Sequence, residues 1–383
     1  MALATQPVSA LHSTFLTMEH EMNQAHFERP EVIRSLLVAL IARAHVILLG
    51  PPGTGKSRLA RDLCQRIVGR FFEWQLTRLS TPEELFGPIS LQGLQHDHYR
   101  RIATGKLPEA DIAYLDETFK ASSAILNTLL AAMNERVFFN DGQAVSMPLQ
   151  MLIGASNELP EDREELGALW DRFLIRHVVS YVKDAASFQK LLQATAQPTA
   201  QTTITLSALL QAQTAAQQID VSNIVLLLGQ LRADLTKHGI IASDRRWRQS
   251  LDAIKAQAWL NGHTAADAHD ATILQYILWD DPDQRLTVAK SVMTLISPFD
   301  QDAQDVLDDV RDTYHQAMAL TDDDASRIQT RVEALNTLTT AGKRLLAIAN
   351  KATEAGKSAA VAHTGYTQVK EWAKTLQESL TNF

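Results

Sequence analysis

The chain has 383 residues, enough for about two or three domains, and its 45% hydrophobic and 21% charged residues are ordinary for a folded globular protein. The formal net charge is −8, from 44 acidic and 36 basic residues, which argues against a protein that coats nucleic acid through a basic surface. A single cysteine, Cys64, excludes a disulfide framework and a cysteine-based metal site.

The N-terminal segment predicts two helices followed by a strand. One helix falls within residues 1–30, and its apolar side chains share one face: Leu11, Phe15, Met18 and Met22. Pro30 suits the first turn of a second helix that ends at Ala42, and the apolar run 45–49 predicts a strand. No signal-peptide pattern is present, and the run 36–49 is too short to span a bilayer, so we expect a cytoplasmic protein without a transmembrane segment.

Residues 50–57, GPPGTGKS, stand between that strand and a helix predicted over 58–68, which is the setting of a phosphate-binding loop. Glycines let the backbone curl tightly and the helix N-terminus adds partial positive charge, so the loop can cradle the phosphates of ATP or ADP. Lys56 would reach the β- and γ-phosphates, and the Ser57 hydroxyl would bind Mg²⁺. The predicted nucleotide-binding residues are Gly50, Pro51, Pro52, Gly53, Thr54, Gly55, Lys56, Ser57 and Arg58.

The next segments lead to a pair of adjacent acids. A strand is predicted over 71–76, and the polar stretch 92–107 is either a solvated hairpin or a loop exposed at a pore or partner surface. Residues 111–117, DIAYLDE, form an apolar strand that ends in Asp116 and Glu117. In a nucleotide-hydrolysing site Asp116 would hold Mg²⁺ through water and Glu117 would polarise the attacking water. The alternative is a strand end with two solvated acids.

A helix over 121–132 and a hairpin that turns at Asp141-Gly142 precede another buried strand, 150–157. Asn157 ends that strand, where it either contacts the γ-phosphate or its attacking water, or caps the following helix.

Residues 166–182 predict a helix that carries Arg172 and runs into a strand of β-branched residues. The sequence leaves the roles of Arg172 and Arg176 open. Either arginine could be solvated or pair with Asp171, and in a ring assembly one of them could reach a phosphate bound by a neighbouring subunit.

The composition changes at the Pro/Thr/Gln-rich segment 194–205, and the rest of the chain reads as helical. A helix over 242–260 starts with Ser243 as its N-cap and places Arg245 and Arg246 in its first turn. Cations at this end oppose the helix dipole, so either an anion is brought to that spot or both arginines are solvated. From residue 298 onward, roughly heptad-spaced apolar residues predict a packed bundle of long helices without a catalytic constellation.

These elements predict an α/β P-loop core, an all-α lid and a C-terminal long-helix bundle. We expect the nucleotide-binding core with its N-terminal helix over 1–183, the lid over 184–297 and the bundle over 298–383.

The segments GPPGTGKS, IAYLDE, GASNELP, LWDRFLIR and SDRRW, in this order and at these distances, resemble the MoxR branch of the AAA+ ATPases, with the RavA group closest. The resemblance covers roughly residues 25–285. It implies a five-stranded parallel sheet in an αβα core, a small helical lid that carries sensor 2, and a homo-hexameric ring that uses ATP and Mg²⁺.

The resemblance also implies roles for single residues. Lys56 and Ser57 match the Walker A pair, and Asp116 and Glu117 match Walker B, with Glu117 as the catalytic base. The remaining catalytic positions are Asn157 as sensor 1, Arg172 as the arginine finger and Arg245 as the sensor 2 arginine, with Arg246 as the alternative one residue along. The segments 92–107 and 138–146 correspond to the helix-two insert and the insert before sensor 1.

RavA-type proteins carry a small β-rich partner-binding module in a triple-helical region, whereas the last eighty or so residues here read as helical throughout. The family commonly works with a protein that contains a von Willebrand A domain. The resemblance therefore implies an ATP-driven, chaperone-like remodeller of a protein partner, with no nucleic acid expected. A nucleic-acid motor and a slow ATP-switched scaffold are the alternatives; the acidic net charge speaks against the first and an intact Glu117 against the second.

Overall fold

The computed structural model describes residues 8–159, 163–193, 202–296, 298–320, 327–354 and 359–381. The chain divides into two compact units, one formed by residues 1–225 and 241–285 and the other by residues 226–240 and 286–383. The finer division into three domains with boundaries after residues 183 and 297 stays a prediction. Within the described ranges, no helix combines the length and the apolar character that crossing a membrane requires.

The first unit is built on a five-stranded sheet in which every pairing is parallel, as predicted. Its strands, in spatial order, are β3 (Phe71–Gln75), β4 (Ile112–Asp116), β7 (Met151–Ser156), β1 (His45–Leu49) and β8 (Phe173–Val178). Every residue of β1 and β7 is buried, which is expected of central strands covered by helices on both faces. The carboxyl ends of β1, β4 and β7 therefore meet along one edge of the sheet.

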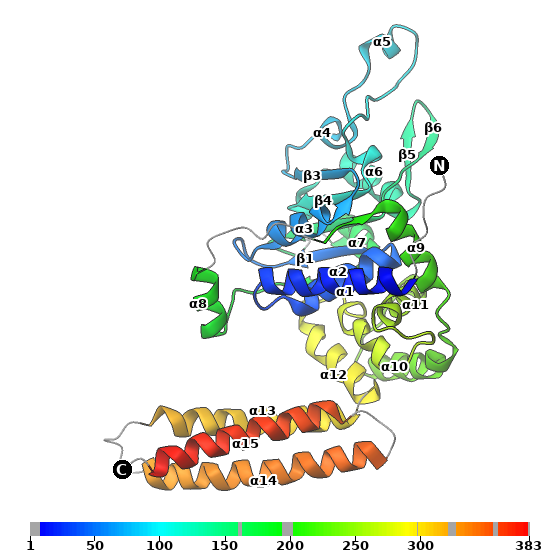
Figure 1. Cartoon of the computed structure of the whole chain (residues 1–383). Coiled ribbons are helices and arrows are strands. Elements are labelled where there is room, and N and C mark those ends of the chain that lie inside the picture. The colour runs from blue at the N-terminus through cyan, green and yellow to red at the C-terminus, as the bar shows by residue number, and fades with distance from the viewer. Residues whose placement is uncertain are drawn as a thin grey trace. The chain divides into compact units, whose positions relative to one another are not determined.

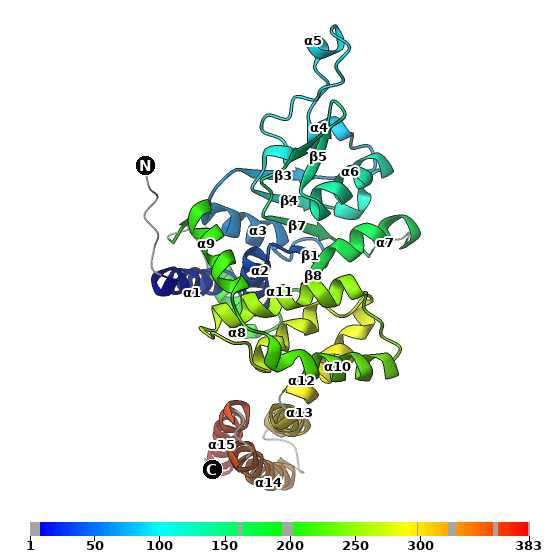
Figure 2. The same cartoon turned by 90° about the vertical axis from the view of Figure 1, so that its right-hand side faces the viewer.

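Helices cover both faces of this sheet and complete the αβα arrangement. Figure 2 shows α2 (Pro30–Ala42) and α3 (Lys56–Gln65) on one face, and α6 (Ser123–Asn134) and α7 (Arg163–Arg172) on the other. The predicted helix over 58–68 is displaced: α3 begins at Lys56 and ends at Gln65. Beyond it, residues 67 and 68 form the short strand β2 (Ile67–Val68), which pairs with β9 (Ile204–Thr205).

The predicted N-terminal helix is α1 (Val8–Ala25). Its predicted apolar face is confirmed, because all four of its members are at most 1% exposed: Leu11, Phe15, Met18 and Met22. Phe15 meets the edge of Trp259, with ring centroids 5.4 Å apart, and Trp259 belongs to α11 (Asp244–Leu260). The N-terminal helix is thus part of the same packed unit as the lid helix α11.

Two inserts project together away from the sheet (Figure 1). One carries the short helices α4 (Pro82–Phe86) and α5 (Leu91–Leu94), and the other is the predicted hairpin of β5 (Val137–Asn140) and β6 (Gln143–Ser146). The hairpin turns at Asp141 and Gly142, which both have positive φ. The side chain of Asp141 accepts a hydrogen bond from the Tyr99 backbone N–H at 2.9 Å, and that of Asn140 accepts one from the Arg101 N–H at 2.7 Å. The predicted polar loop 92–107 is therefore anchored to the hairpin.

The remaining described elements of the first unit are helical, apart from β2 and β9. They include α8 (Ala185–Gln193) and α9 (Leu206–Gln217), together with the 3₁₀ turns η1 (Leu107–Glu109), η2 (Thr118–Lys120), η3 (Ser222–Ile224), η4 (His269–Tyr276) and η5 (Pro282–Gln284). Most of the predicted linker 194–205 lies outside the described residues.

The second unit contains α10 (Val225–Lys237), α12 (Arg285–Ile296) and a bundle of three long helices. The bundle consists of α13 (Pro298–Ala319), α14 (Arg327–Glu354) and α15 (Ala360–Thr381), side by side in Figure 1. Its core is closed and apolar, and it includes Val306, Val310, Leu338, Leu345, Val369 and Leu376. The prediction of a helical region without strands holds for the described residues of 298–383.

Candidate functional site

The loop of residues 50–57 connects β1 to α3, and its backbone requires glycine. Gly50 has φ +148°, and a Cβ there would lie 2.1 Å from the Val179 carbonyl oxygen. Gly55, with φ +83°, is the N-cap residue of α3. The amide groups of the first turn of α3 therefore face the loop, where an anion can bind them.

Lys56 lies at the edge where the central strands end. Its side chain is 7% exposed, and its Nζ donates hydrogen bonds of 3.0 Å to Asn157 Oδ1 and to the Pro51 carbonyl. Burial lowers the pKa of Lys56, while the carboxylates of Asp116 and Glu117 raise it. The fold thus brings together the lysine, both acids and the asparagine that the sequence had singled out.

Glu117 follows β4 in a strained conformation. Its φ is +51°, in the left-handed region that residues with a side chain rarely adopt, and its side chain is 7% exposed. Its Oε1 accepts a hydrogen bond from Asn157 Nδ2, and Lys120 Nζ lies 3.3 Å from its Oε2. Asn157 consequently bridges Lys56 and Glu117, so its side chain belongs to the site.

Ser57 and Asp116 both act on the Tyr114 hydroxyl, with opposite effects on its pKa. Burial raises the pKa of Tyr114, the negative charge of Asp116 raises it further, and Ser57 lowers it. A hydroxyl oxygen and a carboxylate oxygen near one point are hard ligands of the kind that Mg²⁺ takes beside nucleotide phosphates. The residues present therefore fit a magnesium ion.

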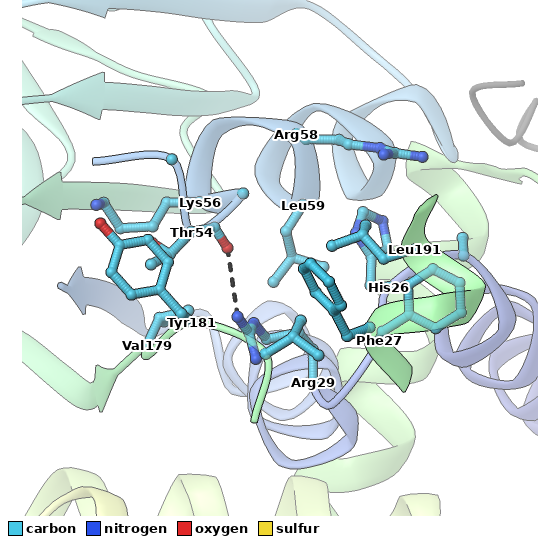
Figure 3. Close-up of a pocket in the computed structure, with 15 residues that line it drawn as sticks. His26, Phe27, Arg29, Thr54, Lys56, Arg58, Leu59, Val179, Tyr181 and Leu191 are labelled. Atoms are coloured by element: carbon cyan, nitrogen blue, oxygen red, sulfur yellow. Dashed lines mark hydrogen bonds between the residues drawn. The ribbon is translucent and has the colours of Figure 1, made fainter. Parts of the chain in front are cut away.

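A cavity of about 390 Å³, a volume typical of small-molecule sites, opens beside the loop. Residues 53–56 and Arg58 line it, together with the turn before α2 and residues of α8. Figure 3 shows Lys56 and Thr54 toward one end, Phe27 and Leu191 toward the other, and Arg29 between them. Arg29 donates a 3.5 Å hydrogen bond to the Thr54 carbonyl. No sequence motif identified the residues of α8 that line this cavity.

Arg172 and Arg245 are not among the residues that line this cavity, and their charges act on one another. Arg172 ends α7, and its Nη1 donates to the Ala168 carbonyl at 2.6 Å. Its Nε is buried and has no hydrogen-bond partner among the described residues. Burial lowers the pKa of Arg172, and the charge of Arg245 lowers it further. Arg245 is exposed in the first turn of α11.

The structure corrects the expectations for Arg176. This side chain is 0% exposed, its guanidinium lies 4.2 Å from the centre of the Trp170 ring, and its Nη1 donates to Asp280 Oδ1 at 2.6 Å. Arg176 is therefore neither solvated nor paired with Asp171, and it is too enclosed to reach a neighbouring subunit.

Arg246 is also enclosed, so it is not the solvated arginine that one reading of the sequence allowed. It is 2% exposed and donates to Asp171 Oδ1 at 2.7 Å and to the Ile277 carbonyl at 3.0 Å. Of the two neighbours in α11, only Arg245 is exposed to a ligand.

A P-loop after the central strand β1, acids at the end of β4, and a helical lid are the features of a P-loop protein of the AAA+ class. Comparison with known proteins agrees with this assignment to the AAA+ class. Residues 13–219 match the family described as the MoxR domain in the MoxR-vWA-beta-propeller ternary systems, and residues 223–292 match an AAA lid domain. Since the first match spans more than half of the chain, the chain belongs to the MoxR family of AAA+ ATPases.

Individual proteins show the same likeness. The chain is 40% identical over 292 residues to the uncharacterized protein MJ0079 of Methanocaldococcus jannaschii, which covers 76% of each chain. It is 27% identical over 175 residues to Chaperone MoxR1 of Mycobacterium tuberculosis, covering 42% of this chain and 45% of that one. The crystal structure of a "putative ATPase" from Cytophaga hutchinsonii shares the fold, with a TM-score of 0.60 at 16% identity over 76% of this chain and 95% of that one.

Proposed function

We propose that this chain hydrolyses ATP to ADP and phosphate. The observation that carries the proposal is the convergence of Lys56, Asp116, Glu117 and Asn157 where three parallel strands end. Lys56 would bind the β- and γ-phosphates, and Asn157 would position the γ-phosphate or its attacking water. Glu117 would orient and polarise that water, and its place is fixed by the Asn157 amide.

The loop and the cavity would hold the nucleotide. The phosphates would lie on the backbone of residues 50–58, and the base would lie against Phe27, Leu59 and Leu191 at the other end of the cavity. Ser57 and Asp116 would hold Mg²⁺, which neutralises the phosphate charge that develops during transfer.

Arg172 and Arg245 would serve the nucleotide of a neighbouring subunit in a homo-hexameric ring. The like charges of Arg172 and Arg245 act on one another, and such a pair favours an anion brought from outside. A guanidinium that stabilises charge on the γ-phosphoryl oxygens raises the rate by roughly 10³–10⁵. Hydrolysis would then require a correctly placed neighbour.

The ring would act on a protein partner as a chaperone-like remodeller. The family description names a vWA protein in the same systems, and one relative is named a chaperone. The exposed apolar side chains of the two inserts support contact with a protein, and they include Leu91, Leu94, Tyr99, Ile102, Phe139 and Val145. A partner with a von Willebrand A domain and a kinship with the RavA group are the more specific parts of this proposal.

ATP hydrolysis by the purified full chain with Mg²⁺ tests the proposal. Wild-type protein should release phosphate, and Glu117→Gln should keep ATP bound while turnover falls roughly 10²–10⁴-fold, as for a lost general base. Glu371→Gln removes an exposed carboxylate from α15 and is the matched control, with turnover unchanged. Wild-type turnover in Glu117→Gln would assign the base to another residue.

A further inference from the structure

Arg172, which is half-buried, and Arg245, which is exposed, each stand next to one partner of an ion pair. Asp171 immediately precedes Arg172 at the end of α7, and Arg246 immediately follows Arg245 in the first turn of α11. Arg246 Nη2 donates to Asp171 Oδ1 at 2.7 Å, so the carboxylate of Asp171 is engaged inward. The Asp171–Arg246 contact therefore links the end of α7, which carries Arg172, to the first turn of α11, which carries Arg245.

Further hydrogen bonds hold this contact in place. The Ser243 hydroxyl accepts from the Arg246 N–H at 3.2 Å as the N-cap of α11, and it donates to Asp171 Oδ1 at 3.4 Å. Behind the pair, Asp280 lies 3.5 Å from Arg246 and pairs with the buried Arg176. Both terminal nitrogens of Arg246 thus have hydrogen-bond partners, since Nη1 donates to backbone carbonyls and Nη2 to Asp171.

The Asp171–Arg246 ion pair stabilises the positions of Arg172 and Arg245, which repulsion between their like charges would disfavour. Arg172 and Arg245 carry like charges that act on one another, and Asp171, the adjacent acid, is committed to Arg246. Glu135 is the other acid whose charge reaches Arg172. A pair of guanidiniums whose like charges act on one another favours the binding of a multiply charged anion.

We propose that Asp171 and Arg246 are positioning residues, which hold Arg172 and Arg245 as one site for the terminal phosphate of a nucleotide bound by a second copy of this chain. The proposal rests on the proposed function, because that nucleotide is the one hydrolysed. Asp171 and Arg246 touch neither the phosphate nor the attacking water, and they act only through the adjacent arginines.

The test uses Asp171→Asn in the full chain. Affinity for a fluorescent ATP analogue should match that of the wild type, because this chain's own loop is intact. Turnover should fall roughly ten- to hundredfold, the effect of displacing a catalytic group by about 1 Å. Glu19→Gln breaks the Arg34–Glu19 pair, which has the same 2.7 Å separation, and as the matched control it should leave turnover unchanged.

Mixing Asp171→Asn with Lys56→Ala subunits separates a positioning role of Asp171 from a purely structural one. Lys56→Ala subunits lack the lysine but keep the arginine site, so they should restore hydrolysis at the intact loop of an adjacent Asp171→Asn subunit. Random mixing in equal amounts predicts about a quarter of the wild-type rate, because a head-to-tail interface pairs the two intact halves that often. Arg246→Lys provides a second variant. Its turnover should fall less than that of Asp171→Asn, and mixing with Lys56→Ala subunits should restore it in the same way.

Undiminished turnover in folded Asp171→Asn, or no recovery in rings shown to be mixed, would overturn the positioning role. If Arg172→Ala is inactive while Asp171→Asn is fully active, only this inference fails. If wild-type protein does not hydrolyse ATP at all, the proposed function fails first.

Discussion

Lys56 and the Arg172–Arg245 pair are all cationic, but their surroundings differ. Lys56 is faced by its own loop carbonyls, by Asn157 and by the charges of Asp116 and Glu117. The charge of Arg245 acts on Arg172, and the adjacent acid Asp171 accepts a hydrogen bond from Arg246. At the first site two carboxylates of this chain act on the cation, whereas at the second the adjacent carboxylate accepts a hydrogen bond from another arginine, Arg246. This difference supports our proposal of an active site divided between two copies of the chain.

Removing Arg172 should have the largest effect. Arg172→Ala should bind ATP normally but lose roughly 10³–10⁵-fold in turnover, because the guanidinium acts on charge that develops only during phosphoryl transfer. Phosphate release under saturating ATP measures the loss. Arg311→Ala removes a half-exposed arginine from α13 and should behave as wild type. An equal loss of turnover in Arg172→Ala and Arg311→Ala would show that the effect is not specific to Arg172.

Removing Lys56 should act on binding instead. Lys56→Ala should weaken affinity for ATP by roughly ten- to a hundredfold, the cost of a charge-assisted hydrogen bond to phosphate. Titration with a fluorescent ATP analogue gives the affinity, and circular dichroism confirms the fold. An unchanged affinity would show that the phosphates lie elsewhere.

A comparison of two glycines isolates the backbone of the loop. Gly50→Ala places a Cβ 2.1 Å from the Val179 carbonyl and should lower the free energy of unfolding by roughly 2–4 kcal/mol. Gly53→Ala meets no atom within 4 Å and carries only the strain of φ +79°, about 1–2 kcal/mol. Urea unfolding measures both. A larger loss in Gly53→Ala would contradict the described course of the loop.

Deleting residues 298–383 should have the smallest effect on hydrolysis. The three-helix bundle has its own closed core and contributes none of the residues assigned to the site. We expect turnover per subunit to stay within about twofold of the full chain, whereas the response to a protein partner should change. A truncated chain that folds but does not bind ATP would show that the bundle contributes to the nucleotide site.

Sequence reasoning located the site residues that short stretches of the chain identify by themselves. The P-loop, the acids that end β4 and Asn157 each follow an apolar strand, and parallel strands end along one edge. Periodicity along the chain predicted the single strands and the helical character of the C-terminal region. The five-stranded parallel sheet was implied by the resemblance to the MoxR branch.

The features that sequence reasoning missed depend on contacts between distant segments. The resemblance chose Arg172 and Arg245, whereas the residue pattern alone left Arg176 and Arg246 open. The structure separates them, because Arg246 is buried against Asp171 and Arg176 against Trp170 and Asp280. The cavity wall formed by α8 likewise depends on how that helix lies beside the loop. Helix ends shifted as well, because residues 67 and 68 pair with β9.

Complementation between two inactive variants tests the divided active site most directly. Arg172→Ala retains the loop and Lys56→Ala retains the arginines, so neither should hydrolyse ATP alone. Mixed in equal amounts, they should recover about a quarter of the wild-type rate, since that share of head-to-tail interfaces joins two intact halves. Full activity of Arg172→Ala alone, or no recovery in rings demonstrated to contain both variants, would contradict the account.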